Sequence, residues 1–316
     1  REGMARLKTT WLLGLPALAA LIIWLAVFSL PDGRLHVYFL DVGQGSAILV
    51  RTPSGQNVLI DGGPGSRAID LGLGRALPFW DRGIDLAVLT HPHDDHVTGL
   101  AEVLRRYRVG QVLEGRRPEP VEGEQTADTP NYQEWRKLLE EKGITRTVAH
   151  AGQEVRLGRG PSAEGRGARL EVLHPPVEPL LGTASDPDNN ALVLRLSYGQ
   201  VSFLLAADLQ REGESYLINS GPEPGDVPSV DSGQALSLSK GSTVLQVGHH
   251  GSETSTSPEF LQAVSPQLAV ISVGAVNPFG HPSAAVRERL NDRLGPDKVF
   301  LTSERGTIEV ITDGQR

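Results

Sequence analysis

The sequence predicts an α/β domain in which two β-sheets lie between layers of helices, a four-layer αβ/βα sandwich. Two observations predict it: short β-branched runs follow one another from residue 35 on, and three helix-like stretches are interspersed among the later runs. Strands and helices do not alternate regularly, which favours two sheets over a parallel barrel. A chain of 316 residues can bury the large core that such a domain needs.

The expected elements form three groups within a domain that spans residues 35–312. The first group consists of strands at 35–41, 46–51, 57–61 and 85–90, as in a sheet built from hairpins. The second has helices at 97–107 and 132–142, then strands at 169–173, 191–197 and 201–206. The third has strands at 243–247, 268–273, 298–301 and 307–311, with a helix at 283–294. Gly, Pro, Ser and Glu concentrate in three expected loops, 114–130, 157–168 and 219–241.

One long uncharged stretch precedes this domain. Residues 11–30 are rich in leucine, and at 1.5 Å per residue they span about 30 Å as a helix, the thickness of a bilayer core. They predict a transmembrane helix, with a cleaved signal peptide and a buried core helix as alternatives. Basic residues within 1–10 mark that flank as cytoplasmic and place the domain outside the cytoplasm. The first methionine is Met4, so we expect a longer natural protein.

The composition restricts the chemistry of any site. The chain has no cysteine, which excludes disulfide scaffolds, iron-sulfur clusters and thiol nucleophiles. A metal would therefore be held by the nine histidines and by carboxylates. The formal net charge of −8 argues against a global basic surface for nucleic acid, although it leaves room for a local site.

The densest group of chemical side chains directly follows the apolar strand that ends at Leu89. Residues 90–96 read Thr-His-Pro-His-Asp-Asp-His, with three His and two Asp within six residues. Imidazoles two residues apart, followed by an adjacent carboxylate and imidazole, can face two metal ions from one rigid turn. A solvated polar loop is the alternative interpretation.

Two further strand ends carry similar residues. Asp208 ends the apolar run 201–207, where it is either a turn former or a bridging carboxylate ligand. Residues 248–252 read Gly-His-His-Gly-Ser after the run 244–247. This pair of histidines fits a ligand plus a substrate contact, with two surface histidines as the alternative.

The pattern His91-x-His93-x-Asp95-His96 resembles the metal-binding motif of the metallo-β-lactamase fold superfamily. Further segments narrow the resemblance: residues 39–47, 59–63, 204–208, 248–252 and 280–283. Together they look like the extracytoplasmic metallo-β-lactamase-like domain of ComEC-type DNA-uptake proteins. The resemblance covers residues 35–311 and implies a metal-dependent hydrolase in the bacterial cell membrane that degrades the non-imported strand of DNA. Its implied partners are DNA, the membrane and an upstream transmembrane channel domain.

The resemblance also implies a set of site residues and two divalent ions, Mn²⁺ or Zn²⁺. One ion is assigned to His91, His93 and Asp208, and the other to Asp95, His96, Asp208 and His250. Asp95, His249 and His281 are the expected catalytic residues, the two histidines lying near the leaving oxygen; a structural cap is the alternative for His281. Substrate contact or support of the ligands is expected from Asp41, Gln44, Asp61, Asn189, Asn190 and Ser252, with Asp61 orienting a ligand histidine.

The chain departs from the family pattern in two places. Many superfamily members carry another ligand histidine before the bridging aspartate, where this chain offers only His150, expected at the surface, and His174, a candidate ligand. Ser46 stands where the ComEC-like group often has Asp. Local cations for a nucleic acid would come from Arg105, Arg106 and Arg108, or from Arg116 and Arg117. Two other functions stay open: hydrolysis of another phosphodiester, ester or lactam on the same site, and a non-catalytic DNA-binding module of a competence channel.

Overall fold

The computed structural model describes residues 15–20, 24, 30–116, 129–158, 167–220 and 241–315. Two compact units are formed, residues 1–32 and residues 33–316. Of the predicted membrane span, only residues 15–20, 24 and 30 are described, so this prediction lies largely outside the described residues. Within the described part of the chain, no helix is both long and apolar enough to cross a bilayer.

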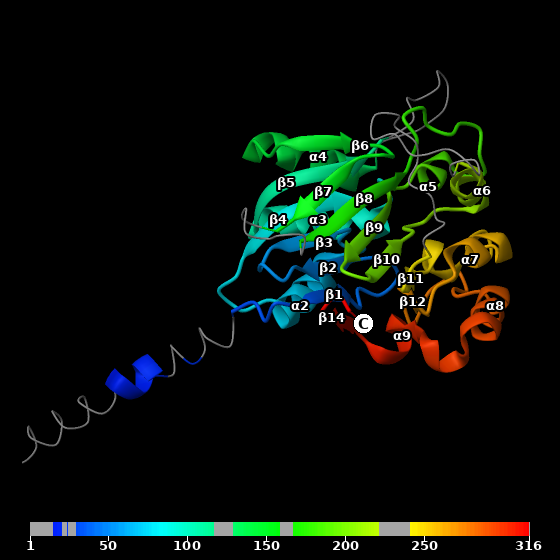
Figure 1. Ribbon diagram of the computed structural model, residues 1–316. Helices are drawn as coiled ribbons and strands as arrows, with labels where there is room; N and C mark the ends of the chain where they lie inside the picture. The colour runs from blue at the N-terminus through cyan, green and yellow to red at the C-terminus, as the bar shows by residue number, and fades with distance from the viewer. Residues whose placement is uncertain are drawn as a thin grey trace, which may run out of the picture. The chain divides into compact units, whose positions relative to one another are not determined.

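The larger unit contains two seven-stranded sheets, each of them mixed (Figure 1). The first has the order β14-β1-β2-β3-β4-β5-β6 and the second the order β13-β12-β11-β10-β9-β8-β7. The strands of the first sheet are β1 (Leu35–Phe39), β2 (Ile48–Arg51), β3 (Asn57–Ile60), β4 (Gly83–Leu89), β5 (Arg108–Gly115), β6 (Arg146–Ala149) and β14 (Ile308–Thr312). Those of the second are β7 (Glu154–Leu157), β8 (Ala168–His174), β9 (Val193–Tyr198), β10 (Val201–Leu205), β11 (Val244–Gln246), β12 (Leu268–Ile271) and β13 (Val299–Leu301).

Helices connect the parallel strands and cover the outer faces of the sheets. The helices beside the first sheet are α2 (Ser66–Ala76), α3 (Asp94–Arg106) and α4 (Pro130–Lys142). The others are α5 (Asp186–Asn189), α6 (Arg211–Asn219), η2 (Gly248–Gly251), α7 (Pro258–Val264), α8 (Ala284–Leu294), η3 (Pro296–Lys298) and α9 (Thr302–Arg305). Figure 1 shows α7 and α8 beside β11 and β12.

Three hydrophobic clusters hold these layers together, as a four-layer sandwich requires. One joins the facing sides of the two sheets through residues such as Phe39 and Phe203. A second packs α2, α3 and α4 on the first sheet around Trp135. The third packs α6, α7 and α8 on the second sheet around Phe260. The predicted α/β sandwich of two sheets is therefore confirmed.

Only one half of each sheet consists of antiparallel strands. In the first sheet β14, β1, β2 and β3 are antiparallel, but β3 to β6 run parallel. In the second, β7 to β10 are antiparallel and β10 to β13 are parallel. The carboxyl ends of parallel neighbouring strands lie at the same edge of a sheet. The loops that follow these strands carry the polar side chains.

Candidate metal centre

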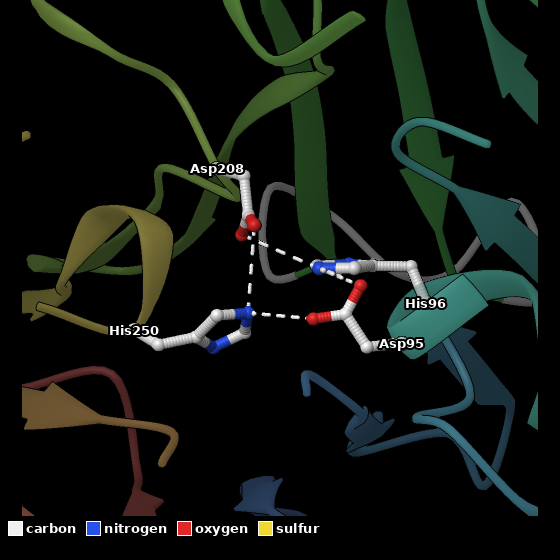
Figure 2. Close-up of side chains that lie close together, drawn as sticks. All are labelled: Asp95, His96, Asp208 and His250. Atoms are coloured by element: carbon white, nitrogen blue, oxygen red, sulfur yellow. Dashed lines mark ion pairs between the residues drawn. The ribbon is translucent and has the colours of Figure 1, made fainter. Parts of the chain in front are cut away.

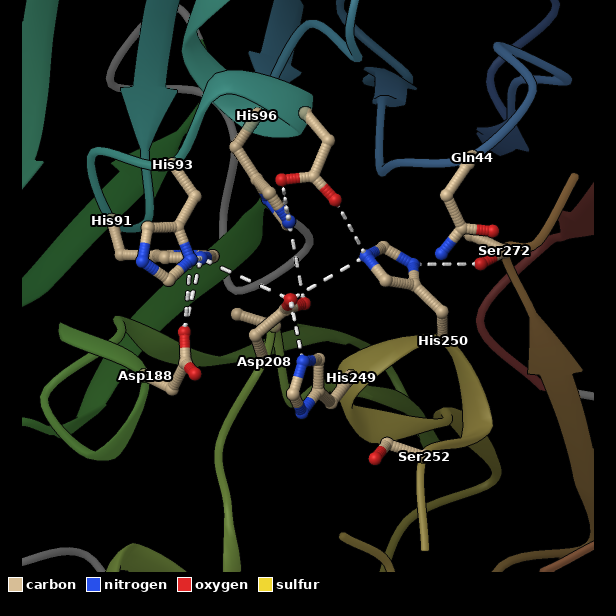
Figure 3. Close-up of polar contacts among 12 residues, drawn as sticks. Gln44, His91, His93, His96, Asp188, Asp208, His249, His250, Ser252 and Ser272 are labelled. Atoms are coloured by element: carbon tan, nitrogen blue, oxygen red, sulfur yellow. Dashed lines mark hydrogen bonds and ion pairs between the residues drawn. The ribbon is translucent and has the colours of Figure 1, made fainter. Parts of the chain in front are cut away.

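Three strand ends bring the predicted metal residues together. The loop after β4 and the first turn of α3 carry the first histidine motif, Asp208 follows β10, and the two neighbouring histidines lie in η2 after β11. Figure 3 shows these side chains converging from both sheets on the Asp208 carboxylate. Residues more than 100 positions apart in the sequence thus share one site.

The first cluster consists of Asp95, His96, Asp208 and His250 (Figure 2). Their candidate ligand atoms lie within 4.8 Å of one another. His250 Nε2 is 3.2 Å from Asp95 Oδ2 and 3.4 Å from Asp208 Oδ2, and His96 Nε2 is 3.3 Å from Asp208 Oδ1. Two imidazoles and two carboxylates at this spacing form a donor set for a divalent cation.

The second cluster consists of His91, His93 and Asp188, whose candidate ligand atoms also lie within 4.8 Å of one another (Figure 3). Asp188 Oδ1 is 3.1 Å from His93 Nδ1 and 3.5 Å from His91 Nε2. Asp188 was not among the ligands expected from the sequence. It comes from the short helix α5 and contributes the only carboxylate of this second cluster.

Asp208 belongs to the first cluster and also faces His91 of the second. The imidazoles of His91, His96, His249 and His250 have nitrogens 3.9, 3.3, 3.9 and 3.4 Å from its carboxylate oxygens. Its side chain is only 2% exposed. Asp208 could therefore contribute a ligand oxygen to a cation held in either cluster.

Several buried polar atoms in these clusters have no hydrogen-bond partner in the part of the chain that the structure describes. They are His96 Nε2, His250 Nε2, Asp188 Oδ1 and Asp208 Oδ1. A buried polar atom without a partner costs about 1–3 kcal/mol, so four of them in one place need a binding partner. The residues present therefore fit a pair of divalent cations held by nitrogen and oxygen.

The ligand histidines are oriented through their second ring nitrogen. His96 Nδ1 donates to Asp61 Oδ2 at 2.8 Å, and His250 Nδ1 donates to the carbonyl oxygen of Ser272 at 2.8 Å. Each bond fixes the tautomer that leaves Nε2 bare and facing the cluster. Asp61 thus contacts His96, one of the histidines that the sequence predicts as ligands.

The backbone of the site is strained. Four non-glycine residues here have positive φ: Asp61 at 58°, Ala207 at 48°, His249 at 49° and His250 at 55°. Such conformations cost on the order of 1 kcal/mol or more each and persist only where the surrounding structure imposes them. These residues lie just after β3, β10 and β11, where the strained backbone directs the side chains towards the clusters.

The electrostatics of the clusters reflect their burial and mutual charge. Burial opposes the charged forms, and it is the main cause that lowers the pKa of His91 to about 3. Against burial, the Asp208 carboxylate raises the pKa of His250 to about 10 and that of His96 well above its usual value. In return, these imidazoles hold the pKa of Asp208 well below its usual range despite its burial. The negative charge at the centre is thus maintained for a cation.

The other expected site residues surround the clusters at different distances. His249 is 24% exposed, and its Nδ1 is 3.3 Å from Thr254 Oγ1, a hydroxyl that also contacts Ser252 Oγ at 3.0 Å. Gln44 lies beside His250 in Figure 3, and its Oε1 accepts a hydrogen bond from the amide of Gly274 at 3.3 Å. Asp41 is exposed and accepts from the amide of Gly43, outside both clusters.

Asn189 and Asn190, expected as substrate contacts or as support of the ligands, are both buried and bonded to the protein. Asn189 is fully buried; its Oδ1 accepts from the amide of Gly213 and its Nδ2 donates to Glu212. Asn190 is 2% exposed and bonds the backbone of Leu180 through both its oxygen and its nitrogen. These amides hold α5, and with it Asp188, in place.

The two remaining histidine candidates and the arginines lie outside the clusters. His174 is buried and donates from Nε2 to the carbonyl oxygen of Asn189 at 2.7 Å, while His150 bonds Ala151 in the turn after β6. Arg105 pairs with Glu102 and Glu134 in the last turn of α3, about 15 Å along the helix from Asp95. Its neighbour Arg106 pairs with Asp70 and Glu102. Arg108 and Arg116 are exposed, and Arg117 lies outside the described residues.

Comparison with known proteins places these features in a family. The model of the metallo-beta-lactamase superfamily matches residues 40–275. Similar proteins include "ComE operon protein 3" of Bacillus subtilis, 29% identical over 87% of this chain and 32% of the relative, and "Competence protein ComA" of Neisseria gonorrhoeae, 29% identical over 89% and 33%. The chain therefore spans about a third of the length of these relatives.

A solved structure shares the fold. CmlA, a diiron β-hydroxylase from Streptomyces venezuelae, superposes with a TM-score of 0.52 at 15% identity, over 87% of this chain and 54% of that protein. The fold, the family match and the candidate metal clusters agree with one another. The chain belongs to the metallo-beta-lactamase superfamily, as a metal-dependent hydrolase with relatives among the ComEC-type competence proteins.

Proposed function

We propose that this chain is a two-metal phosphodiesterase that cleaves DNA, and that it degrades the non-imported strand during DNA uptake. The observation that carries the proposal is the position of Asp208, a buried carboxylate that belongs to the first cluster and also faces His91 of the second. A pair of divalent cations held by these residues would supply the charge stabilisation that an in-line displacement at phosphorus needs. The similarity to a Neisseria protein named as a competence protein supports DNA as the substrate.

The residues divide the work as follows. Asp95, His96 and His250 would hold one cation, His91, His93 and Asp188 the other, and Asp208 would lie between them. When bound, two divalent cations activate water and offset charge on the phosphate oxygens. With no thiolate among the donors, both Mn²⁺ and Zn²⁺ suit the set.

One side of the centre is open to solvent. The side chains of His93, Asp95 and His249 are 39%, 31% and 24% exposed, whereas those of His91 and His96 are buried. A phosphodiester would therefore approach past these three residues. His249 lies at this opening, where its imidazole can donate a hydrogen bond to the leaving oxygen.

The acidic composition is compatible with this function. Cations held in the clusters would attract a phosphate even though Arg105 and Arg106 are paired with carboxylates away from the site. The relatives are about three times as long as this chain, which supports a place for it as the hydrolase part of a longer membrane-bound uptake protein. The basic flank within residues 1–10 favours the outer side of the membrane for this part.

The test is cleavage of labelled single-stranded and double-stranded DNA by the purified chain loaded with Mn²⁺ or Zn²⁺. Asp95→Ala should abolish cleavage. Asp94→Ala is the matched control, because Asp94 lies in the same helical turn but is exposed and belongs to neither cluster. DNA left intact by the metal-loaded parent would contradict the proposal. Chromogenic phosphodiester and lactam substrates, with RNA, show whether another substrate class takes its place.

A further inference from the structure

A row of aromatic rings leads from the metal centre to the surface. The rings of His250 and His249 lie 6.2 Å apart, those of His249 and His281 5.7 Å apart, and those of His281 and Phe279 5.7 Å apart. The last pair is nearly parallel, with an interplanar angle of 26°. The row begins at the buried His250, within 3.4 Å of Asp208, and ends at a side chain in solvent.

The loop that carries the outer end of this row is braced. Asn277 Nδ2 donates to the carbonyl oxygens of Gly274 and His281 at 3.0 and 2.9 Å, and its Oδ1 accepts from the amide of His281 at 3.0 Å. The amide of Ser283 donates to the carbonyl oxygen of Gly251, next to the metal-centre histidines. Phe279 is thus held at a fixed place relative to the centre.

Phe279 has an unusually large exposed surface for an aromatic side chain. It is 65% exposed, and Val276 in the same loop is 95% exposed. A phenyl ring that stacks on one neighbour and keeps most of its surface in water retains apolar area for a ligand. Only two rings, His281 and His249, separate this ring from His250 at the centre. One bound molecule could therefore contact Phe279 and the centre at the same time.

We infer that Phe279 is a stacking platform for an unpaired nucleobase within a few nucleotides of the phosphate held at the centre. This inference rests on the proposed function and names how the strand is held. Stacking on an aromatic face tolerates every base and contributes about 1–3 kcal/mol per base. It requires no cationic groove, which suits an acidic chain whose Arg105 and Arg106 are paired elsewhere. The preferred substrate is then single-stranded at this point.

The test compares Phe279→Ala with the parent on oligothymidylate and on an oligomer of equal length made of abasic sites. Phe279→Ala should raise the KM for oligothymidylate about 5-fold to 150-fold, the equivalent of one stacked base. Phe279→Trp should restore it. For the abasic oligomer the KM should already be high in the parent, with less than a twofold change on substitution. An unchanged KM for oligothymidylate in Phe279→Ala overturns the inference.

A matched control and a binding measurement separate this inference from the proposed function. Phe79, 79% exposed, lies before β4, at the end of that strand opposite to the metal centre, so Phe79→Ala should behave as the parent. Fluorescence anisotropy of labelled oligothymidylate reports binding whether or not the strand is cut. If the parent binds oligothymidylate without cutting it and Phe279→Ala binds it more weakly, the result contradicts the proposed nuclease activity and supports the stacking platform. Equal dissociation constants for parent and Phe279→Ala, or no binding by the parent, would overturn the platform.

Discussion

Asp61 Oδ2 accepts a hydrogen bond from His96 Nδ1 at 2.8 Å and another from the Thr90 hydroxyl at 2.8 Å, while its Oδ1 accepts from the Thr90 amide at 2.9 Å. All three donors converge on a carboxylate that is 1% exposed. Asp61 therefore ties the end of β3 to the loop after β4 and fixes the ring that faces Asp208. A side chain that binds no cation can in this way control a ligand.

Asp61→Asn should lower metal affinity about 10-fold to 100-fold. An amide has a single acceptor oxygen, so either the Thr90 amide or His96 Nδ1 would face an NH₂ group. Titration of the metal against a competing chelator measures the effect. Glu309→Gln is the control, because Glu309 also accepts from a histidine, His36, but outside both clusters. Equal affinity in Asp61→Asn and the parent would exclude this positioning role.

Asp188→Ala should reduce the metal content from two ions per chain to one. It removes the carboxylate that faces His91 and His93 and leaves the other cluster intact. Elemental analysis of the purified, metal-loaded protein measures the ratio. Asp186→Asn, on the same short helix, is the control, because the Asp186 carboxylate accepts from Gly182 and Thr183 in the preceding turn and belongs to neither cluster. Two ions retained in Asp188→Ala would show that the second cluster does not hold a cation.

Asp188 marks the limit of what the sequence could predict about the site. The histidine motif, Asp208 and the pair in η2 each follow an apolar strand, and that signal identified their position. Asp188 follows no strand: it lies in Asp-Pro-Asp-Asn-Asn, which reads as a turn. Its place beside His93 depends on the packing of α5 on α6 through Asn189, a contact between distant segments that no local pattern encodes.

The fold shows the same division between periodic and weakly patterned segments. Runs of β-branched residues located the central strands within a few residues. The helix α2 was missed because Gly72 and Gly74 lower its helix propensity, yet its apolar residues Ile69 and Leu73 are buried on the first sheet. The strand β5 was missed because its first half, Arg108 to Gln111, lies largely in solvent and lacks an apolar run. Tertiary packing decided both elements.

Gly99→Ala should destabilise the protein by about 2–3 kcal/mol, the usual cost of overpacking. A Cβ at Gly99 would lie 1.8 Å from the carbonyl oxygen of Gly62, so α3 would be pushed away from the loop after β3. Because α3 carries Asp95 and His96, metal affinity should fall as well. Urea unfolding measures the stability. Gly74→Ala is the opposite control: Gly74 is an exposed helical residue with nothing within 4 Å of a Cβ, and alanine there should stabilise by about 0.5–1 kcal/mol.

His174 makes the free energy of unfolding depend on pH. Burial lowers its pKa from 6.5 to about 4, although the carbonyl oxygen of Asn189 accepts a hydrogen bond from Nε2. A second proton would have to lie on Nδ1, which is buried with no hydrogen-bond partner in the part of the chain that the structure describes. The folded state therefore takes up this proton at lower pH than the unfolded chain does.

The contribution of His174 should be complete above about pH 6.5 and decline as the pH falls towards 4, because in that window the unfolded chain binds a proton that the folded chain does not. The loss amounts to about 3 kcal/mol. Urea unfolding of the protein with a metal chelator, at pH 7 and at pH 4.5, gives two free energies of unfolding. Their difference measures the loss. His174→Gln should be less stable at pH 7 but lose less on acidification, whereas Tyr216→Phe, which keeps a ring near His174, should retain the parental loss. An identical acid loss in His174→Gln and the parent would place the titrating group elsewhere.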